Sequence, residues 1–288
     1  MKSLVRWGTT LGLVGSSLIF SVFGGNASVL ALSEQQIKEK LDSVPVFLIT
    51  NNQGIPLTSS VPAGQNGQKP GAVTQVFMSG QEAQAFMDQL RNRKDQDPKM
   101  AEILKSLQIT AVPMGVIYQK FKETANSPER LLFAFQPGKQ ELEGALALLN
   151  QGGQKVKQFP SVPVFIVKSP DKGYVSVKRR SDNKEIIPVF LSKKDAQGLL
   201  GQVKSQVPKA EIQVVDIDGI IKTLQDKNDQ WLNQVALVPS SESIEYISKL
   251  AGNPANRSAA PGQNQPAKPA APSNNRKNLQ SATPTKRP

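Results

Sequence analysis

One short stretch of this 288-residue chain occurs twice. Residues 43–48 read SVPVFL and residues 161–166 read SVPVFI, so the first five letters agree. A short apolar run rich in β-branched and aromatic residues is typical of a strand. Both runs carry a proline near their start, which fits the first residue of a strand or the edge of a sheet. The repeated strand therefore predicts a chain built from two similar units.

The agreement between the two copies continues along the chain. Two further pairs of segments align: VFMSGQEAQAFMDQL (76–90) with VFLSKKDAQGLLGQV (189–203), and FAFQPGKQELEGALALL (133–149) with VALVPSSESIEYISKLA (235–251). The first copy has extra residues near GQNGQKPG (64–71) and QDPKMAEILKS (96–106), where loops or added surface helices tolerate insertion. We predict one unit over residues 32–150 and a second over 151–250.

Each copy predicts a small unit of mixed α and β structure. A strand, a turn, a second strand such as residues 174–180 and a third strand lead to a helix that begins with a serine. Ser79 is followed three residues later by Glu82, and Ser192 by Asp195, which predicts a capping box and a weaker analogue of it. The second half of each copy repeats strand, short helix, strand, proline and helix.

The predicted architecture is an α+β fold with an internal duplication. Two pseudo-twofold-related lobes would each hold a small mixed sheet with packed helices. Because a proline cannot continue a ladder on both sides, we expect the two proline-bearing strands at sheet edges, where they meet or flank the seam between the lobes.

The two ends of the chain differ from this central part. Residues 1–31 combine a basic start, an apolar centre at 11–23 and short residues before a cleavage point, which predicts a signal peptide. Residues 251–288 are rich in Pro, Ala and Asn and hold six Lys or Arg and no acid, which predicts a disordered tail. These ends carry most of the net charge of +12. We therefore expect weak contact of the tail with anionic membrane or cell-wall polymer, and no nucleic-acid partner.

The composition and the short motifs argue against catalysis. The chain has no Cys and no His, which excludes disulfides, Ser–His and Cys–His triads and Cys/His zinc sites. Asp216 and Asp218 could pair on one strand face, but an N-cap at Asp218 is the preferred interpretation. The glycine-rich segment 64–71 lacks the GK[ST] of a phosphate loop, and the basic run 178–180 has no interleaved aromatic residues. We expect no enzyme, no metal and no cofactor.

Apolar side chains that adapt to varied partners are the candidates for binding. Phe47 and Phe165 occupy the same position in the two copies. Successive strand residues point to opposite faces, so an uncovered second face of the sheet would form a groove there. The other candidates lie in the first copy: Met114, Tyr118, Phe121, Phe133 and Phe135. The alternative for each of these residues is a core position, since large apolar side chains are usually buried.

The order of these motifs resembles that of a known family. The segments VPVFLITNNQGIPL (44–57), QVFMSGQEAQAFMDQLR (75–91), and AVPMGVIYQ (111–119) leading to LLFAFQP (131–137) are similar to the cyanobacterial relatives of the twenty-two-kilodalton component of the Tic family. That family is named after the translocon at the inner chloroplast envelope. The resemblance covers roughly residues 40–250 and leaves out both chain ends.

The resemblance implies a soluble protein that works between two membranes, in the periplasm or also in the thylakoid lumen. It further implies a two-winged pseudosymmetric fold with hydrophobic pockets, chaperone-like binding and a role in outer-membrane biogenesis. The first functional hypothesis is thus an ATP-independent periplasmic escort factor for unfolded or precursor outer-membrane proteins, with the outer-membrane translocation or assembly machinery as a further partner. The alternative is an envelope scaffolding protein that is tethered by its basic tail.

Overall fold

A computed structural model describes residues 32–61, 71–93, 98–125, 127, 131–179, 181–227 and 229–252. The predicted signal peptide and nearly all of the predicted tail lie outside these residues, as does most of the segment 64–71. In the part of the chain that is described, no helix has the length and apolar character needed to cross a bilayer.

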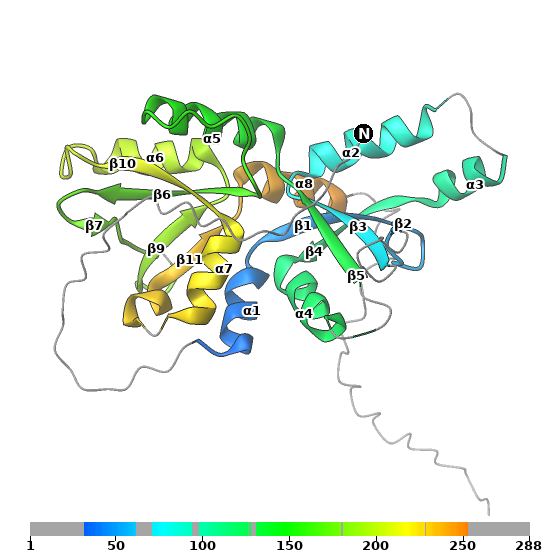
Figure 1. The fold of residues 1–288 in the computed structure, drawn as a ribbon, viewed down its shortest axis with the longest axis horizontal. Helices are drawn as coiled ribbons and strands as arrows, with labels where there is room; N and C mark the ends of the chain where they lie inside the picture. The colour runs from blue at the N-terminus through cyan, green and yellow to red at the C-terminus, as the bar shows by residue number, and fades with distance from the viewer. Residues whose placement is uncertain are drawn as a thin grey trace, which may run out of the picture.

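The first half of the chain folds around a mixed sheet of five strands (Figure 1). Hydrogen-bonded neighbours follow the order β2-β3-β1-β4, and β5 is a further partner of β3. The strands are β1 Pro45–Thr50, β2 Thr58–Val61, β3 Gly71–Phe77, β4 Gln108–Pro113 and β5 Leu131–Gln136. The helices of this half are α1 Glu34–Asp42, α2 Gly80–Arg91, α3 Pro98–Ser106, α4 Met114–Thr124 and α5 Lys139–Gln151.

The second half folds around a sheet of six strands in the order β10-β6-β9-β11, with β7 on β6 and β8 on β9. The strands are β6 Pro163–Ser169, β7 Gly173–Tyr174, β8 Val177–Lys178, β9 Glu185–Phe190, β10 Glu211–Asp216 and β11 Val235–Val238. The helices are α6 Lys193–Val203, α7 Ile217–Asp226, the 3₁₀ turn η1 Gln230–Gln234 and α8 Ser241–Gly252. The single strand predicted over 174–180 is thus divided between β7 and β8.

The two sheets correspond strand by strand. The orders β4-β1-β3-β5 and β10-β6-β9-β11 agree, with antiparallel pairs β1/β4 and β6/β10 and parallel pairs β3/β5 and β9/β11. Helices α2 and α6, α4 and α7, and α5 and α8 follow equivalent strands, whereas α3 is extra in the first half. The predicted α+β fold of two small mixed sheets with packed helices is confirmed. The matching topology is what a duplicated unit would produce.

The proline-bearing strands lie inside the sheets, and the prediction of edge strands is wrong. Strand β1 lies between β3 and β4, and β6 lies between β9 and β10. Pro45 and Pro163 are the first residues of these strands, where a missing N–H does not interrupt the ladder. The two strand starts do flank the seam between the halves, because both prolines line the cleft that lies there.

Helix α1 is not among the elements that the sequence analysis predicted. Ser33 and Gln36 form a reciprocal capping box at its start, and Ile37 and Leu41 are buried. Its packing against α4, α7 and β11 places it between the two sheets. The largest cluster of buried apolar residues accordingly includes side chains of both halves, such as Leu41, Val46 and Val164. The two predicted lobes therefore share one core.

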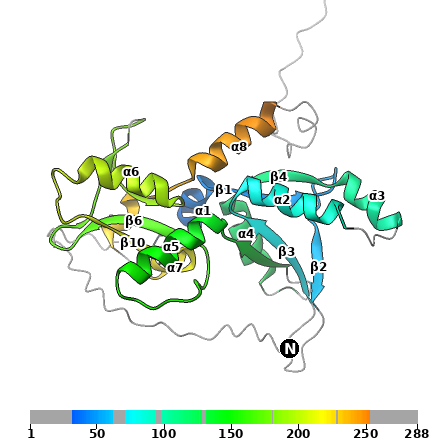
Figure 2. The ribbon, with the colours of Figure 1, turned by 90° about the horizontal axis from the view of Figure 1, so that it is seen from above.

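The last helix of each half packs on the other half (Figures 1 and 2). Helix α5 follows β5 but lies against β6, β10 and α6, and Ala145 packs with Phe165. Helix α8 follows β11 but lies against α2, and the Tyr246 ring meets Phe47 edge-on with centroids 5.3 Å apart. A Cβ atom on Gly80 of α2 would lie 2.3 Å from the Tyr246 ring, so the close approach of α8 requires a glycine there. The halves thus exchange their terminal helices.

Candidate binding surface

The exchanged helices cover the two repeated phenylalanines. Phe47 and Phe165 are fully buried. The sheet faces on which they lie are covered by α8 and α5, which come from the opposite halves. The hypothesis of an uncovered groove at Phe47 and Phe165 is therefore wrong for this structure. Both residues act in packing, and neither is accessible to a partner in this conformation.

The other five candidate residues come together on α4 and β5, which pack against each other. We call this region the α4–β5 surface: Met114, Tyr118, Phe121, Phe133 and Phe135. Met114 is buried, and the side chains of Tyr118, Phe133 and Phe135 are partly buried against the shared core. Phe121 is 41% exposed. Which of these side chains contact a partner stays a prediction.

A single apolar stripe on α4 connects the core to this exposed side chain. Met114, Ile117, Tyr118 and Phe121 follow the spacing i, i+3, i+4, i+7, so they share one helix face. Burial along the stripe decreases from Met114 and Ile117 to Tyr118 and then to Phe121. The stripe therefore extends beyond the packed core, and Phe121 presents an aromatic ring to the outside.

Tyr118 is held by polar contacts from two other helices. Its hydroxyl donates to the Glu34 carboxylate of α1 and accepts from Nε2 of Gln225 of α7 at 2.8 Å. Lys122 Nζ lies 2.9 Å from the same Glu34 carboxylate. Burial, reinforced by the Glu34 acceptor, raises the pKa of Tyr118 to about 12, and the hydroxyl donor in turn lowers the pKa of Glu34. These contacts fix α4 against α1 and α7 and leave Phe121 unconstrained by them.

A cleft of about 590 Å³ lies at the seam, away from the α4–β5 surface. Helices α2, α5, α6 and α8 all begin at this cleft, and each contributes a carboxylate to the start of another helix. Glu82 of α2 accepts from the backbone N–H of Lys139 at the start of α5. Glu141 of α5 accepts from the backbone N–H of Lys193 at the start of α6, at 2.7 Å. Carboxylates at helix N-termini are stabilising.

The starts of the other two helices, α8 and α2, also contact a carboxylate from another helix. Asp195 of α6 accepts from the backbone N–H of Ser241 at 3.1 Å, and Glu242 of α8 lies 3.4 Å from the backbone N of Gln81. The predicted serine caps do form, since Ser79 and Ser192 accept from the backbone three residues on. The reciprocal half of the predicted capping boxes is absent in both helices, because the carboxylates serve the exchanged helices instead.

These contacts give the cleft a structural role. Glu82, Glu141, Asp195 and Glu242 each have a backbone partner on another helix. Burial together with the nearby Asp195 raises the pKa of Glu141. None of the aromatic residues of the α4–β5 surface lines the cleft. Size alone would favour the cleft as a binding site, but four of its carboxylates are used to join helices of the two halves.

The aspartate pair also has a structural role, with one correction. Asp216 Oδ1 accepts from the backbone N–H of Gly219 at 2.7 Å and is the N-cap of α7. Asp218 accepts from Ser161 Oγ at 2.6 Å. The prediction of an N-cap at Asp218 is wrong by two residues, because β10 ends directly before α7.

The fold defines the class: an α+β protein of two mixed sheets whose halves exchange their terminal helices. Within that class the chain belongs to the Tic22-like family, whose family model matches residues 17–249. Family membership implies a role related to protein transport and a place outside the cytoplasm.

Three relatives show how far the likeness extends. The solved structure of Anabaena Tic22, described as a protein of protein transport, is 62% identical, with a TM-score of 0.72 over 76% of this chain and 97% of that one. Tic22 from Plasmodium falciparum shares the fold at 22% identity, with a TM-score of 0.57 over 75% of this chain and 97% of that one. Protein TIC 22-like, chloroplastic, of Arabidopsis thaliana is 24% identical over 216 residues, which are 72% of this chain and 61% of the Arabidopsis protein.

Proposed function

We propose that this protein is an escort factor of the periplasm that binds unfolded or precursor outer-membrane proteins without ATP. The observation that carries the proposal is the apolar stripe of α4, which runs out of the core and ends on the exposed ring of Phe121. The predicted signal peptide supports export, with the thylakoid lumen as a second compartment. The outer-membrane translocation or assembly machinery is the expected recipient of the bound chains.

The proposed mechanism is capture at equilibrium. An unfolded precursor exposes apolar side chains, and burial of these against the α4–β5 surface removes apolar area from water. The precursor loses conformational freedom on binding, so the affinity is modest, with Kd on the order of micromolar. The proposal includes no catalytic step, because the chain lacks Cys and His and the carboxylates described above serve as helix caps.

The proposal is tested by the ability of the full chain to suppress aggregation of an unfolded outer-membrane β-barrel protein, followed by light scattering. We expect the wild type to suppress aggregation and Phe121→Ser to lose most of this activity, since the ring is exposed and its removal leaves the core intact. Ile244→Ser is the matched control, because Ile244 of α8 is 47% exposed and lies on another helix. Circular dichroism verifies that both variants are folded.

Two results would overturn the proposal. The first is a lack of suppression by the wild type at several-fold molar excess over the unfolded protein. The second is suppression that Phe121→Ser and Ile244→Ser reduce equally, because this would locate the activity outside the α4–β5 surface.

An alternative function rests on the tail. Its six basic residues and lack of acids favour attachment to anionic polymer or lipid, which a scaffolding protein of the envelope would use. Deletion of residues 253–288 separates the two functions. The escort hypothesis expects aggregation suppression to survive the deletion, whereas the scaffold hypothesis expects co-sedimentation with cell-wall material to be lost.

A further inference from the structure

Strand β5 forms an edge of the first sheet, and within the part of the chain that the structure describes it pairs with β3 alone (Figure 1). The backbone N–H of Met78 donates to the carbonyl of Gln136 at 3.0 Å, so Gln136 faces β3. Backbone groups of successive residues in a strand point alternately to its two sides. Ala134 therefore also faces β3, and the N–H and C=O groups of Phe133 and Phe135 point away from the sheet.

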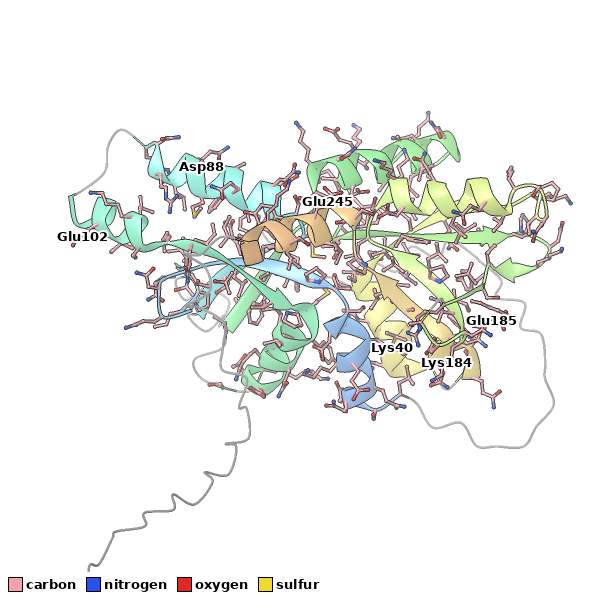
Figure 3. The ribbon with its side chains drawn as sticks, turned by 180° about the vertical axis from the view of Figure 1, so that it is seen from behind. Lys40, Asp88, Glu102, Lys184, Glu185 and Glu245 are labelled. Atoms are coloured by element: carbon pink, nitrogen blue, oxygen red, sulfur yellow. The ribbon has the colours of Figure 1, made fainter. Side chains whose placement is uncertain are left out.

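The equivalent edge of the second sheet is closed by the chain itself. By the same alternation, the carbonyls of Val235 and Leu237 in β11 point outward. Lys40 Nζ lies 2.8 Å from the Val235 carbonyl oxygen, and Ser43 Oγ lies 2.9 Å from that of Leu237. Both side chains come from α1 or its C-cap, and Figure 3 shows Lys40 directed from α1 toward the second sheet. Burial, together with the charge of nearby Arg179, lowers the pKa of Lys40.

No described residue covers the edge of β5 in this way. Within the described residues, the outward N–H and C=O groups of Phe133 and Phe135 have no hydrogen-bond partner. All six residues of β5 are partly exposed. A row of unpaired backbone groups along a sheet edge is a template for another strand. The outward-pointing backbone groups recur at every second residue, about 6.6–7 Å apart, and an extended polypeptide has the same spacing.

We propose that the free edge of β5 binds an extended segment of a client polypeptide as an added strand of the first sheet. This inference rests on the proposed escort function and names its mode of recognition: backbone hydrogen bonds to Phe133 and Phe135. The edge is continuous with the α4–β5 surface, because Phe133 and Phe135 pack against the same core as the stripe of α4. One face of the added strand thus lies on the side that α4 occupies.

This geometry defines the class of client. Backbone pairing is independent of side chains, so many sequences are accepted. The face of the added strand on the α4 side favours apolar residues, because Phe133 and Phe135 pack against the core there. Leu132 and Ala134, on the opposite face of β5, belong to none of the buried apolar clusters, so a segment with alternating apolar and polar residues is preferred. Transmembrane strands of outer-membrane barrels have this pattern, which makes an unfolded barrel strand a natural client.

Hydrogen exchange, measured by NMR on the full chain, tests the pairing directly. The probe is a nine-residue peptide of alternating apolar and polar residues taken from a barrel strand. We expect the outward amides of Phe133 and Phe135 to exchange at least about tenfold more slowly with saturating peptide. The amides of Ala134 and Gln136, which face β3, are protected already and serve as internal controls. Unchanged exchange at Phe133 and Phe135 under saturation would overturn the inference.

A second peptide separates strand addition from simple apolar capture. It carries the same side chains but has N-methyl groups in place of its backbone N–H donors. Strand addition predicts that N-methylation weakens binding by at least about tenfold, since two or more hydrogen bonds are lost. A different result is that both peptides bind the wild type equally and that neither binds the Phe121→Ser variant. This result would retain the escort function and overturn strand addition. Binding of neither peptide, without aggregation suppression, would overturn both.

Self-pairing of β5 between two copies is a distinct outcome. It would appear as slow exchange of the Phe133 and Phe135 amides that increases with protein concentration in the absence of peptide. Sedimentation would then show a dimer. That result would assign the edge to a second copy of this chain and overturn the client proposal.

Discussion

The aromatic candidate residues fall into two groups: rings that an exchanged helix covers, and rings that no exchanged helix covers. Phe47 and Phe165 lie under α8 and α5 and are fully buried, whereas Phe121 lies beyond the shared core. The sequence predicts both groups as binding candidates, because a single copy of the repeat does not show which helix covers which sheet. The same residue type thus serves the core in one place and is available to a partner in the other.

Substitution of a buried ring should affect stability and leave the α4–β5 surface intact. We expect Phe47→Ala to lower the free energy of unfolding by about 3–5 kcal/mol, because it leaves a cavity next to the Tyr246 ring. Urea unfolding followed by circular dichroism measures the loss. Phe121→Ser is the comparison and should change stability by less than about 1 kcal/mol. Similar losses in both variants would contradict this division.

Glycine substitutions test how closely α8 packs against α2. Gly80→Ala should destabilise the fold, since its Cβ would overlap the Tyr246 ring at 2.3 Å and push α8 away from α2. Gly198→Ala in α6 is the control, because no atom lies within 4 Å of its added Cβ. A helical Gly→Ala change without contacts should stabilise by about 1 kcal/mol. Thermal melts of the two variants should therefore shift in opposite directions, and shifts in the same direction would argue against tight packing of α8.

At the scale of elements, much of the structure follows from local sequence. The first strands of both copies, the serine N-caps of α2 and α6 and the α3 insertion all occur where the sequence predicts them. The exchange of α5 and α8 could not be predicted, because their apolar stripes indicate that one face is buried but do not indicate the partner. For the same reason the sequence predicts local capping contacts for Glu82 and Asp195, since the start of the partner helix is distant in sequence.

The carboxylate of Glu141 gives the exchange a pH dependence. Burial raises the pKa of the Glu141 carboxyl group in the folded state. On lowering the pH, this group is therefore protonated earlier in the folded protein than in the unfolded chain. Glu141 therefore contributes more to stability at a pH below its folded pKa than it does at pH 7. Glu141→Gln removes the charge and keeps an acceptor for the Lys193 N–H.

We therefore expect Glu141→Gln to melt at the same or a higher temperature than the wild type at pH 7. This difference should shrink as the pH is lowered through the folded pKa of the carboxyl. Glu143→Gln is the control, because it removes the same charge from the exposed side of the same helix. A lower melting temperature for Glu141→Gln at pH 7, with Glu143→Gln unchanged, would show that the ionised carboxylate stabilises the exchange.

At the scale of the molecule, the shared core and the exchanged helices join the halves into one unit. A duplicated sequence suggests two domains that fold independently, but the largest cluster of buried apolar residues includes side chains of both halves. We expect a single unfolding transition in calorimetry, with equal calorimetric and van't Hoff enthalpies. Phe165→Ala should shift this transition as a whole. Two transitions, of which Phe165→Ala lowers only one, would contradict a shared core.

The surface that remains free after this assembly is asymmetric, although the topology is repeated. Helix α1 closes the edge of the second sheet through Lys40 and Ser43, and among the described residues no equivalent helix covers the edge at β5. The repeat in the sequence predicts equal halves and does not reveal this difference. The contacts of Lys40 and Ser43 are thus enough to distinguish the two sheet edges.

The most direct test of the account is to locate the client on the protein. A photo-crosslinking amino acid replaces Phe121 in one variant and Ile244 in the other, both within the full chain, and an unfolded outer-membrane β-barrel protein is added before illumination. The account predicts a strong crosslink from position 121 and little from position 244. Crosslinks of equal yield, or a crosslink from position 244 alone, would contradict binding at the α4–β5 surface.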